Sequence, residues 1–377
     1  MRIAILAPHA GHVAGGIETT AKGLRDHFLS ENDCEVFSLT KTPWTTRVPG
    51  FRGPQSATLV TRLRLNYLNH LIPRMYIIKN YALPEFSYSY NLFPVLKRYN
   101  PDILINLNVS IIALFCKHFR SRYQVPFINV GEAGCIYMEV KSAMTRPDAY
   151  VALTPVAKRY IEKRVPGLHV EVIPNGVDLN LFSPGGPSLT TDYLLAKSAN
   201  PNLSLTRPFV LSSSRLVREK RLDLLIKAVS RLETGTLILV GDGAARKKLV
   251  ELGDRLLRNR IVFTGTMSQE KLAKLYRLCD VFSLPSHNEA FGNVLVEAMA
   301  SGLPVVATHE EGFQWIVGDE GGILVDVTET QAYAQALNKA YASDFGDGPE
   351  RQAQRFSWQV VIKKYMKLIE SILSRDE

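Results

Sequence analysis

The sequence predicts an α/β protein with two doubly wound, Rossmann-like domains, each with a parallel sheet covered by helices. Its 377 residues are enough for about two domains at roughly 150 residues each. Short apolar or β-branched runs alternate with helical patterns through both halves, which is typical of parallel sheets with covered faces. A stretch rich in Pro, Gly and Asn, near 175–207, separates the two halves.

In the first half, the segment 2–7 is predicted to be a strand. The segment 17–30 is predicted to be a helix, because its apolar residues recur at helical spacing. Further strands, with helical segments between them, are expected at 35–39, 103–107, 126–130 and 150–153. This half is predicted to form one domain over 1–175.

In the second half, each short apolar run is followed by turn residues and then by a helical pattern. The expected strands are 209–212, 236–240, 261–264, 281–284 and 305–307. The expected helices are 222–232, 244–257, 269–278 and 294–300. This half is predicted to form a domain over 207–355, joined to the first by a linker at 176–206.

The composition excludes several classes of protein. With 46% hydrophobic and 21% charged residues, the chain is neither disordered, collagenous nor a coiled coil. The longest uncharged apolar runs are far shorter than the roughly 18 residues that a membrane span needs. No secretory signal is expected, since the first residues form a strand without a cleavage site. The four cysteines stand far apart with no CxxC spacing, which favours a reducing cytoplasm over a disulfide framework or a zinc site.

The net charge of +9 lies entirely within residues 1–175. Such asymmetry indicates an anionic partner for that half, although solubility charge explains it about equally well. The segment 51–99 carries seven basic residues, one acidic residue and nine aromatic ones. This mixture suits an anionic membrane surface, or an ordinary core with a basic outer face. A nucleic-acid partner is not expected, because no recognised motif accompanies the charge.

Two loops combine glycines or cations with the start of a helix. Gly15 and Gly16 follow the first strand, where they allow backbone amides to approach an anion. The absence of a G-x-G-x-x-G motif disfavours a nicotinamide cofactor. Arg215 and Lys220 follow the first strand of the second domain, five residues apart, and could reach one diphosphate. The alternatives are a plain turn at the glycines and a solvated basic turn at the cations.

The segment 286–304 is the most informative part of the chain. A helix is expected to begin near Asn293 and to stop before Gly302, so the amides of 292–294 would point out of its N-terminus. Glu289 lies in the loop before the helix and Glu297 lies one turn inside it. Two carboxylates so placed could bind two hydroxylated parts of one ligand, with its phosphates at the amides between them. The alternative is a capped helix with one exposed glutamate; a buried Glu297 would need a hydrogen bond.

With these residues, the sequence resembles the retaining glycosyltransferases of family 4, which have the GT-B fold of two Rossmann-like domains facing across a cleft. The resemblance covers nearly the whole chain and rests on motifs in a fixed order. They are 15–18 (GGIE), 173–178 (IPNGVD), Arg215 with Lys220, 241–243 (GDG), 263–265 (FTG), 280–286 (DVFSLPS) and the pair Glu289 and Glu297. The C-terminal segment 356–377 also resembles the family, in which this helix packs back onto the first domain.

The resemblance implies a nucleotide-sugar donor, with a role for each matching residue. Arg215 and Lys220 would hold the diphosphate, and the glycines Gly15 and Gly16 would add an amide to it. Glu289 would contact sugar hydroxyls and Glu297 the ribose hydroxyls. The other residues expected at the donor are Gly265, Phe291, Gly292, Asn293 and Val294. No metal and no cofactor are expected, since the chain has no DxD motif.

The sequence departs from the family pattern in three places, one of which is Ala290, where relatives often have Pro or Gly. Relatives carry a histidine after the strand at 126–130, where this chain has Glu132. Glu132 is therefore taken as a fourth catalytic candidate beside Glu289, Arg215 and Lys220, with His9 and His12 as substitutes and an exposed turn residue as the alternative. The segment 309–312 (HEEG) replaces the two-glycine turn that faces the donor sugar, which leaves the sugar open.

The expected function is retaining transfer from a UDP- or GDP-sugar to a hydroxyl of a glycan or lipid-linked acceptor, in cell-surface polysaccharide or glycolipid synthesis. The expected location is the cytoplasm, with the segment 51–99 against the inner membrane face. Two alternatives remain open. One is an epimerase or hydrolase of the same fold, which would convert the donor without an acceptor. The other is a non-catalytic partner subunit that binds the nucleotide sugar.

Overall fold

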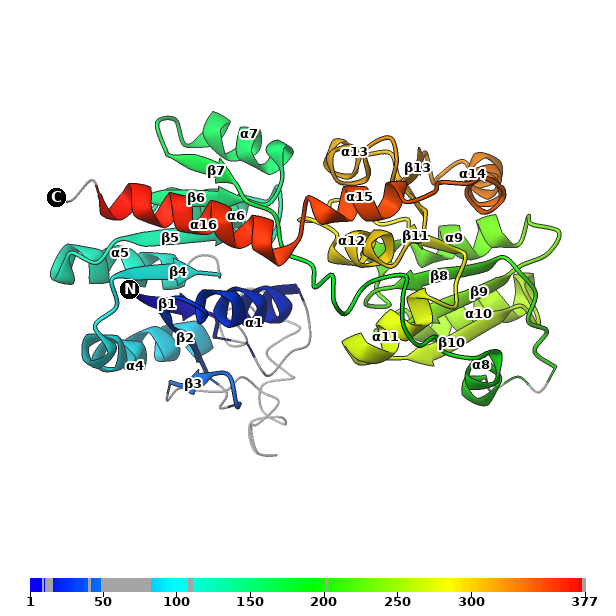
Figure 1. Ribbon diagram of the computed structural model, residues 1–377, viewed down its shortest axis with the longest axis horizontal. Helices are drawn as coiled ribbons and strands as arrows, with labels where there is room; N and C mark the ends of the chain where they lie inside the picture. Colours follow the sequence, from blue (N-terminus) through cyan, green and yellow to red (C-terminus); the bar gives the residue numbers. More distant parts are fainter. Residues whose placement is uncertain are drawn as a thin grey trace, which may run out of the picture. The chain divides into compact units, whose positions relative to one another are not determined.

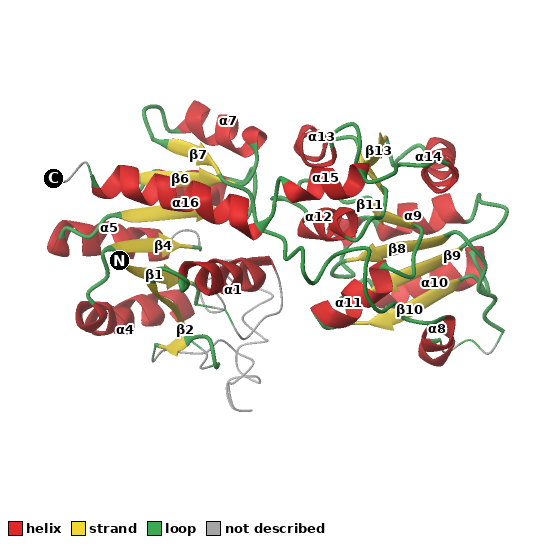
Figure 2. Cartoon of the chain, viewed as in Figure 1, coloured by secondary structure: helices red, strands yellow, loops and turns green. Residues whose placement is uncertain are grey.

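The computed structural model describes residues 1–8, 10, 16–39, 42–48, 83–107, 111–198, 200 and 202–374. The chain divides into two compact units, one formed by Met1–Pro174 with Val361–Glu377 and the other by Asn175–Val360. Each unit contains one parallel sheet with helices packed against it (Figures 1 and 2). The predicted class of two doubly wound α/β domains is confirmed.

The sheet of the first unit has seven parallel strands in the order β3-β2-β1-β4-β5-β6-β7. The order reverses between β1 and β4, and ligands of such sheets bind at the carboxyl ends of the strands beside this reversal. The strands are β1 (Arg2–Leu6), β2 (Asp33–Ser38), β3 (Thr46–Arg47), β4 (Ile103–Asn106), β5 (Phe127–Gly131), β6 (Ala149–Ala152) and β7 (Val170–Val172).

Helices cover this sheet because each carries one apolar face. In α7, Thr154 accepts a hydrogen bond from the Ala157 amide (3.2 Å) and Pro155 stands in the first turn, so the helix start follows from the sequence. The helices are α1 (Gly16–Phe28), α4 (Leu83–Tyr99), α5 (Ile111–Tyr123), α6 (Tyr137–Ala143), α7 (Pro155–Arg164) and α16 (Trp358–Leu373), the last of which begins in the second unit.

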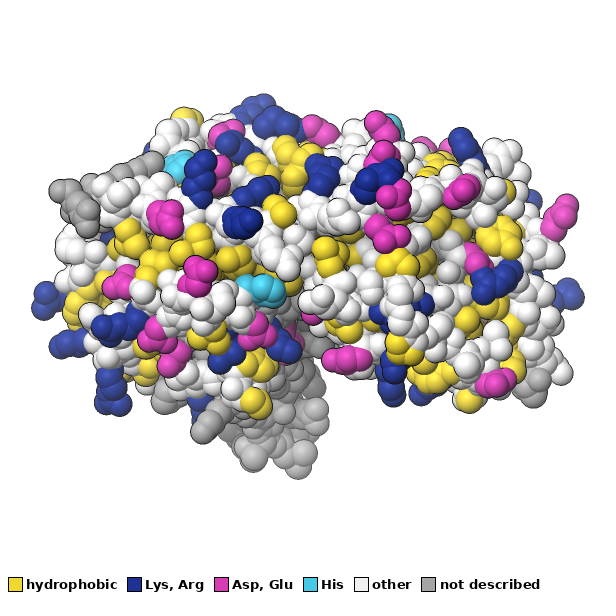
Figure 3. Space-filling model, in the orientation of Figure 1, with side chains coloured by type: hydrophobic (Ala, Val, Ile, Leu, Met, Phe, Trp, Pro, Cys, Tyr) yellow, Lys and Arg dark blue, Asp and Glu magenta, His cyan; other side chains and the backbone are white. Residues whose placement is uncertain are grey.

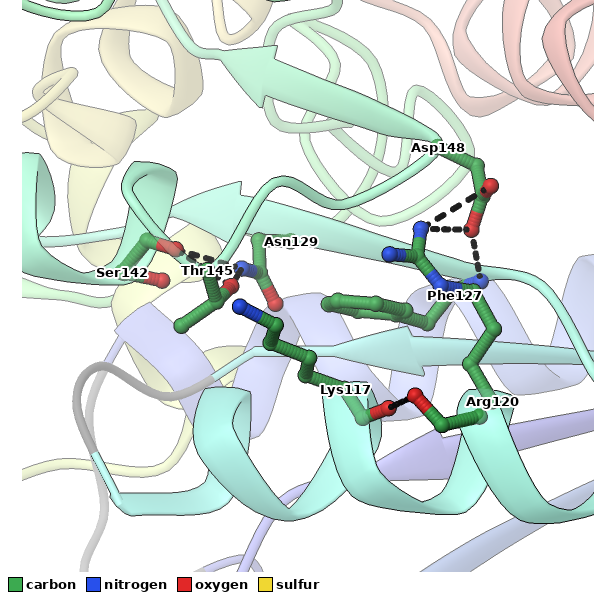
Figure 4. Close-up of polar contacts among 8 residues, drawn as sticks. Lys117, Arg120, Phe127, Asn129, Ser142, Thr145 and Asp148 are labelled. Carbon is green, nitrogen blue, oxygen red and sulfur yellow. Dashed lines mark hydrogen bonds and ion pairs between the residues drawn. The ribbon is translucent and has the colours of Figure 1, made fainter.

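Polar side chains fasten α5 and α6 to the edge of β5 (Figure 4). Arg120 of α5 contacts both carboxylate oxygens of Asp148 at 3.1 Å, and Asp148 also accepts from the Phe127 amide (2.9 Å). The buried Asn129 amide donates to the Ser142 carbonyl (3.0 Å), at the end of α6. The C-terminal end of α6 is therefore held against the middle of the sheet.

The end of the basic and aromatic stretch forms α4, and 49–82 lies outside the described residues. Tyr88 is fully buried and its hydroxyl donates to the Phe37 carbonyl (2.7 Å), while Lys97 and Arg98 are exposed. Residues 87–99 thus match the alternative of a core with a basic outer face. On the face that Figure 3 shows, Lys and Arg side chains are scattered among acidic ones.

The second unit has six parallel strands in the order β10-β9-β8-β11-β12-β13, with its reversal between β8 and β11. The strands are β8 (Phe209–Ser213), β9 (Thr236–Val240), β10 (Ile261–Gly265), β11 (Val281–Leu284), β12 (Val305–Thr308) and β13 (Gly322–Val325). The helices are α8 (Thr191–Lys197), the 3₁₀ helix η3 (Arg218–Lys220), α9 (Leu222–Val229), α10 (Arg246–Leu256), α11 (Gln269–Tyr276), α12 (Asn293–Ala300), α13 (Glu311–Val317), α14 (Thr330–Ala342) and α15 (Gly348–Gln354).

The segment expected as a linker, 176–206, lies within the second unit. It contains α8, whose Leu194 is fully buried. The Leu189 amide donates to the Lys274 carbonyl (3.0 Å) and the Ser204 amide to the Asn259 carbonyl (2.8 Å). These long-range contacts, which periodicity does not reveal, attach the segment to the domain that follows it.

The chain enters and leaves the second unit at neighbouring positions. The Val177 amide donates to the Phe356 carbonyl (2.8 Å), and the Trp358 ring packs on Gly176 so closely that a Cβ there would overlap it. Val361–Glu377 belongs to the first unit, where the Tyr365 ring meets Phe28 edge-on at 6.2 Å. No helix in the described ranges has both the length and the apolar character needed to cross a membrane.

Candidate active site

Most of the expected donor residues stand at the carboxyl ends of the strands of the second unit. Arg215 follows β8, Gly265 ends β10, and Glu289 lies in the loop between β11 and α12. Because β8 and β11 are neighbours at the reversal of the sheet, the loops after them meet at the place where ligands bind in such folds.

An ion pair joins these two loops. Lys220, at the end of η3, pairs with Oε1 of Glu289. The two side chains are only 18% and 17% exposed, so water screens the pair less than a surface salt bridge. Arg215, in the same loop between β8 and η3, is exposed and adds a second positive charge to that loop. The site therefore presents two cations and one carboxylate, which suits a ligand with both phosphates and hydroxyls.

The loop that carries Arg215 depends on the glycines after β9. Gly241 has a φ of +123°, and a Cβ there would overlap the Ser214 carbonyl oxygen. The Gly241 amide donates to the Gly265 carbonyl (2.9 Å) and the Leu216 amide to the Asp242 carbonyl (2.9 Å). The motif at 241–243 is thus a tight turn whose glycines allow two loops to touch.

We expect Gly241→Ala to lower the free energy of unfolding by about 2–4 kcal/mol, because it adds backbone strain and an overlap with Ser214. Gly346→Ala is the matched control: Gly346 also has a positive φ, of 52°, but a Cβ there meets nothing within 4 Å. It should cost only about 1 kcal/mol of strain. Urea unfolding measures both, and equal losses would show that the contact with Ser214 contributes nothing.

The N-terminus of α12 directly follows the loop that carries Glu289. Gly292 precedes it with a φ of +100°, and no side chain caps the helix. The Asn175 side-chain amide donates to Oδ1 of Asn293 (3.1 Å), which fixes the first turn. Phe291 is buried and anchors the loop. The positive end of the helix is thus available to an anion.

Glu297, one turn inside α12, is 8% exposed. Burial raises the pKa of Glu297 to about 7, although a hydrogen bond from the Tyr276 hydroxyl to Oε2 (3.2 Å) lowers it in part. The hydrogen bond that the sequence required for a buried Glu297 is therefore present. Tyr276 was not among the expected site residues, since nothing in its sequence context sets it apart from a core aromatic.

The part of the second unit that contains these residues is similar to known proteins. Residues 196–356 match the model of the family "Glycosyl transferases group 1". This part of the second unit is therefore similar to the group 1 glycosyltransferases.

Two curated relatives match about half of the chain. A D-inositol 3-phosphate glycosyltransferase of Xylanimonas cellulosilytica is 33% identical over 201 residues, which cover 50% of this chain and 48% of that protein. The lipopolysaccharide core biosynthesis glycosyltransferase LpsE of Rhizobium meliloti is 34% identical over 172 residues, 44% of this chain and 50% of that protein. The chain thus spans about half the length of the curated relatives it matches.

The fold extends over the whole chain. HepE from Anabaena, solved in complex with UDP and glucose, superposes with a TM-score of 0.72 and 20% identity. The superposition covers 98% of this chain and 100% of HepE. The chain therefore has the GT-B fold of two Rossmann-like α/β domains.

Within the matched region, the loop after β12 supports the loop that carries Glu289. Glu310 pairs with Nδ1 of His287 and accepts a hydrogen bond from the Asn288 amide (3.3 Å). Asn288 has a φ of +58°, and Glu289 is the next residue. The departure from the two-glycine turn at 309–312 thus brings a carboxylate that fixes the backbone beside Glu289. Sequence reasoning flagged that departure but did not foresee the partner His287.

Three of the expected residues belong to the first unit. Gly16 opens α1 and is exposed, and Glu132 follows β5. Gly15 lies outside the described residues, as do His9 and His12. Among the residues that are described, no group of three or more His, Cys, Asp or Glu is arranged to hold a metal ion.

Proposed function

We propose that the chain is a retaining, metal-independent glycosyltransferase that uses a UDP- or GDP-sugar, with UDP the first base to test. The observation that supports this most is the Lys220–Glu289 pair at the N-terminus of α12, within the region that is similar to the group 1 glycosyltransferases. HepE, a structural neighbour of the same fold, was solved with UDP and glucose.

In this proposal each group has one task. Lys220 and Arg215 hold the diphosphate, and the amides at the start of α12 stabilise the charge that develops on it. Glu289 accepts hydrogen bonds from the sugar hydroxyls, and Glu297 accepts them from the ribose. The acceptor hydroxyl attacks C1 from the face that the diphosphate leaves. The bond from C1 to the phosphate oxygen breaks, and the leaving phosphate takes the hydroxyl proton.

We propose a hydroxyl of a glycan or lipid-linked glycan as the acceptor, in cell-surface polysaccharide or glycolipid synthesis on the cytoplasmic side of the membrane. LpsE, named for lipopolysaccharide core biosynthesis, supports a glycan acceptor. The excess of +9 in residues 1–175 supports an acceptor or surface that carries negative charge.

Thermal shift with UDP-, GDP- and ADP-sugars tests the donor site. A nucleotide sugar at 100 times its Kd adds about 2.7 kcal/mol, enough to raise the Tm by about 2 °C or more. We expect one nucleotide series to shift the wild type and Arg218→Ala, but not Arg215→Ala. Arg218 is the matched control because it is an exposed arginine three residues away. No shift with any series would overturn the donor site, and turnover of the donor without an acceptor would indicate a hydrolase or epimerase.

A further inference from the structure

The first unit contains a buried carboxyl group that the proposed function does not use. Glu139 of α6 is 1% exposed. Its Oε1 accepts a hydrogen bond from the Ala133 amide (2.7 Å), and its Oε2 accepts one from the Tyr150 hydroxyl (2.6 Å). Glu139 therefore links three parts of the unit, namely α6, strand β6 and the turn 131–136 that follows β5.

The turn fits closely around this group. A Cβ at Gly131 would lie 2.5 Å from the Tyr150 hydroxyl oxygen, so β5 approaches the tyrosine as nearly as a glycine allows. Gly134 has a φ of +77°, and the Ile136 amide donates to its carbonyl (2.9 Å). Ile136, the residue before α6, makes no side-chain cap. Glu139, in the first turn of the helix, instead reaches back to the turn, much as the glutamate of a capping box does.

We propose that Glu139 is a positioning residue: with Tyr150 it holds the turn 131–136 in the shape that presents Glu132, and this hold requires Glu139 to be ionised. The part that concerns Glu132 rests on the proposed function. The part that concerns the turn does not. Asn129 holds the other end of α6 through the Ser142 carbonyl, so α6 is fixed and the turn is the element free to respond (Figure 4).

The chemistry of the carboxyl group explains the requirement. An ionised carboxylate accepts charge-assisted hydrogen bonds from both donors. A protonated one is neutral and keeps the contact with Tyr150 only by reversing the direction of that bond, so both bonds become weaker. Burial raises the pKa of Glu139 to about 7, and the hydrogen bonds from Tyr150 and Ala133 act in the opposite direction. Glu139, Cys135 and Glu132 act electrostatically on Tyr150, and Glu132 also acts on Tyr365 of α16. The hold should therefore weaken as the pH falls through about 7.

The turn carries its own reporter. Cys135 is exposed, whereas the other three cysteines of the chain, Cys34, Cys116 and Cys279, are buried. The rate of maleimide labelling at Cys135 reports how open the turn is. At each pH, the rate for a variant is divided by the rate for the wild type. The effect of thiol ionisation on the rate is then the same in both and cancels.

We expect Glu139→Gln to label about tenfold faster than wild type at about pH 8, the equivalent of one lost hydrogen bond to a charged group. At about pH 6 the two rates should agree, because glutamine resembles the protonated acid. In the wild type, the labelling rate per ionised thiol should rise as the pH falls and Glu139 takes up a proton. Tyr150→Phe should move the midpoint of this rise to higher pH, because the hydrogen bond that the variant lacks lowers the pKa of Glu139. Glu162→Gln, at an exposed glutamate of α7, should label like wild type throughout.

A purely structural role predicts something different: both variants would open the turn by the same factor at every pH. That result would overturn the proposal, and so would rates unchanged in either variant. Tyr150→Phe keeps the ring in the core, so the midpoint can be measured even if Glu139→Gln folds poorly.

Kinetics then separate the two parts. Glu139→Gln should raise the acceptor KM or lower kcat while the thermal shift by the donor stays unchanged. A loosened turn with unaltered kinetics would overturn the role of Glu139 in presenting Glu132 and leave the donor site intact. Loss of the donor shift in the wild type would instead refute the proposed function.

Discussion

Replacing Lys220 by alanine is expected to lower the kcat of the proposed transfer by about 10²–10³-fold, the range seen when one preorganised group facing developing charge is removed. The variant loses the cation at the diphosphate. It also leaves the Glu289 carboxylate, which is only 17% exposed, without the partner that the structure gives it. Steady-state kinetics with the nucleotide sugar that stabilises the protein measure the effect.

The control is Arg218→Ala, an exposed cation in the same 3₁₀ helix, whose kcat should stay within about twofold of wild type. A double-mutant cycle adds a second check. Because Lys220 and Glu289 act as a unit, Lys220→Ala combined with Glu289→Gln should lose far less than the product of the single losses. If the two single losses of kcat multiply fully in the double variant, or if Lys220→Ala has a normal kcat, the ion pair has no role in the mechanism.

Replacing Glu297 by glutamine should weaken nucleotide binding about 10–100-fold and yet stabilise the protein at alkaline pH. The loss follows from hydrogen bonds between the ribose and a charged acceptor. The gain follows from burial, which raises the pKa of Glu297 from 4.5 to about 7. Between these values the folded protein holds a proton that the unfolded chain releases, so stability falls as the pH rises through this window, by about 3 kcal/mol.

Glutamine does not titrate, so the stability of the variant lacks this dependence on pH. Its Tm should exceed that of wild type at about pH 8 and approach it near pH 4.5. Glu251→Gln, an exposed site on α10, is the control and should change neither stability nor nucleotide affinity. Tight nucleotide binding by Glu297→Gln at pH 8 would exclude the ribose contact, and a normal pH slope would exclude Glu297 as its source.

The sequence predicted the parts of the fold that local pattern determines. The strands at 236–240 and 281–284 have the predicted bounds, and the helix predicted to begin near Asn293 begins there. Lys220 and Glu289, 69 residues apart, were assigned to one site through the family resemblance, and the structure brings them together because their loops follow neighbouring parallel strands.

What the sequence could not predict depends on contacts between distant segments. The helix α8 was missed because a short, polar segment gains its stability from packing rather than from periodicity. The strands β7 and β13 were missed because each is an edge strand of its sheet and lacks the fully buried apolar run of the inner strands. Glu139 had no signal at all: its partner Tyr150 lies on the next strand, and the Ala133 amide belongs to a turn whose shape sequence alone does not give.

The pairing of Val177 with Ser357 means that the second unit begins and ends at one point. Topologically it is an insertion within the first unit, which resumes at Val361. Because its two ends are neighbours, the second unit can be replaced as a whole. A gene fragment encoding 175–360 can be exchanged for that of another protein of the same fold through two neighbouring splice points, one just before the bridge at Val177 and one in the first turn of α16. Hybrids of the two units are therefore accessible by recombination without redesign of either sheet, and under the proposed function they would test which unit selects the donor.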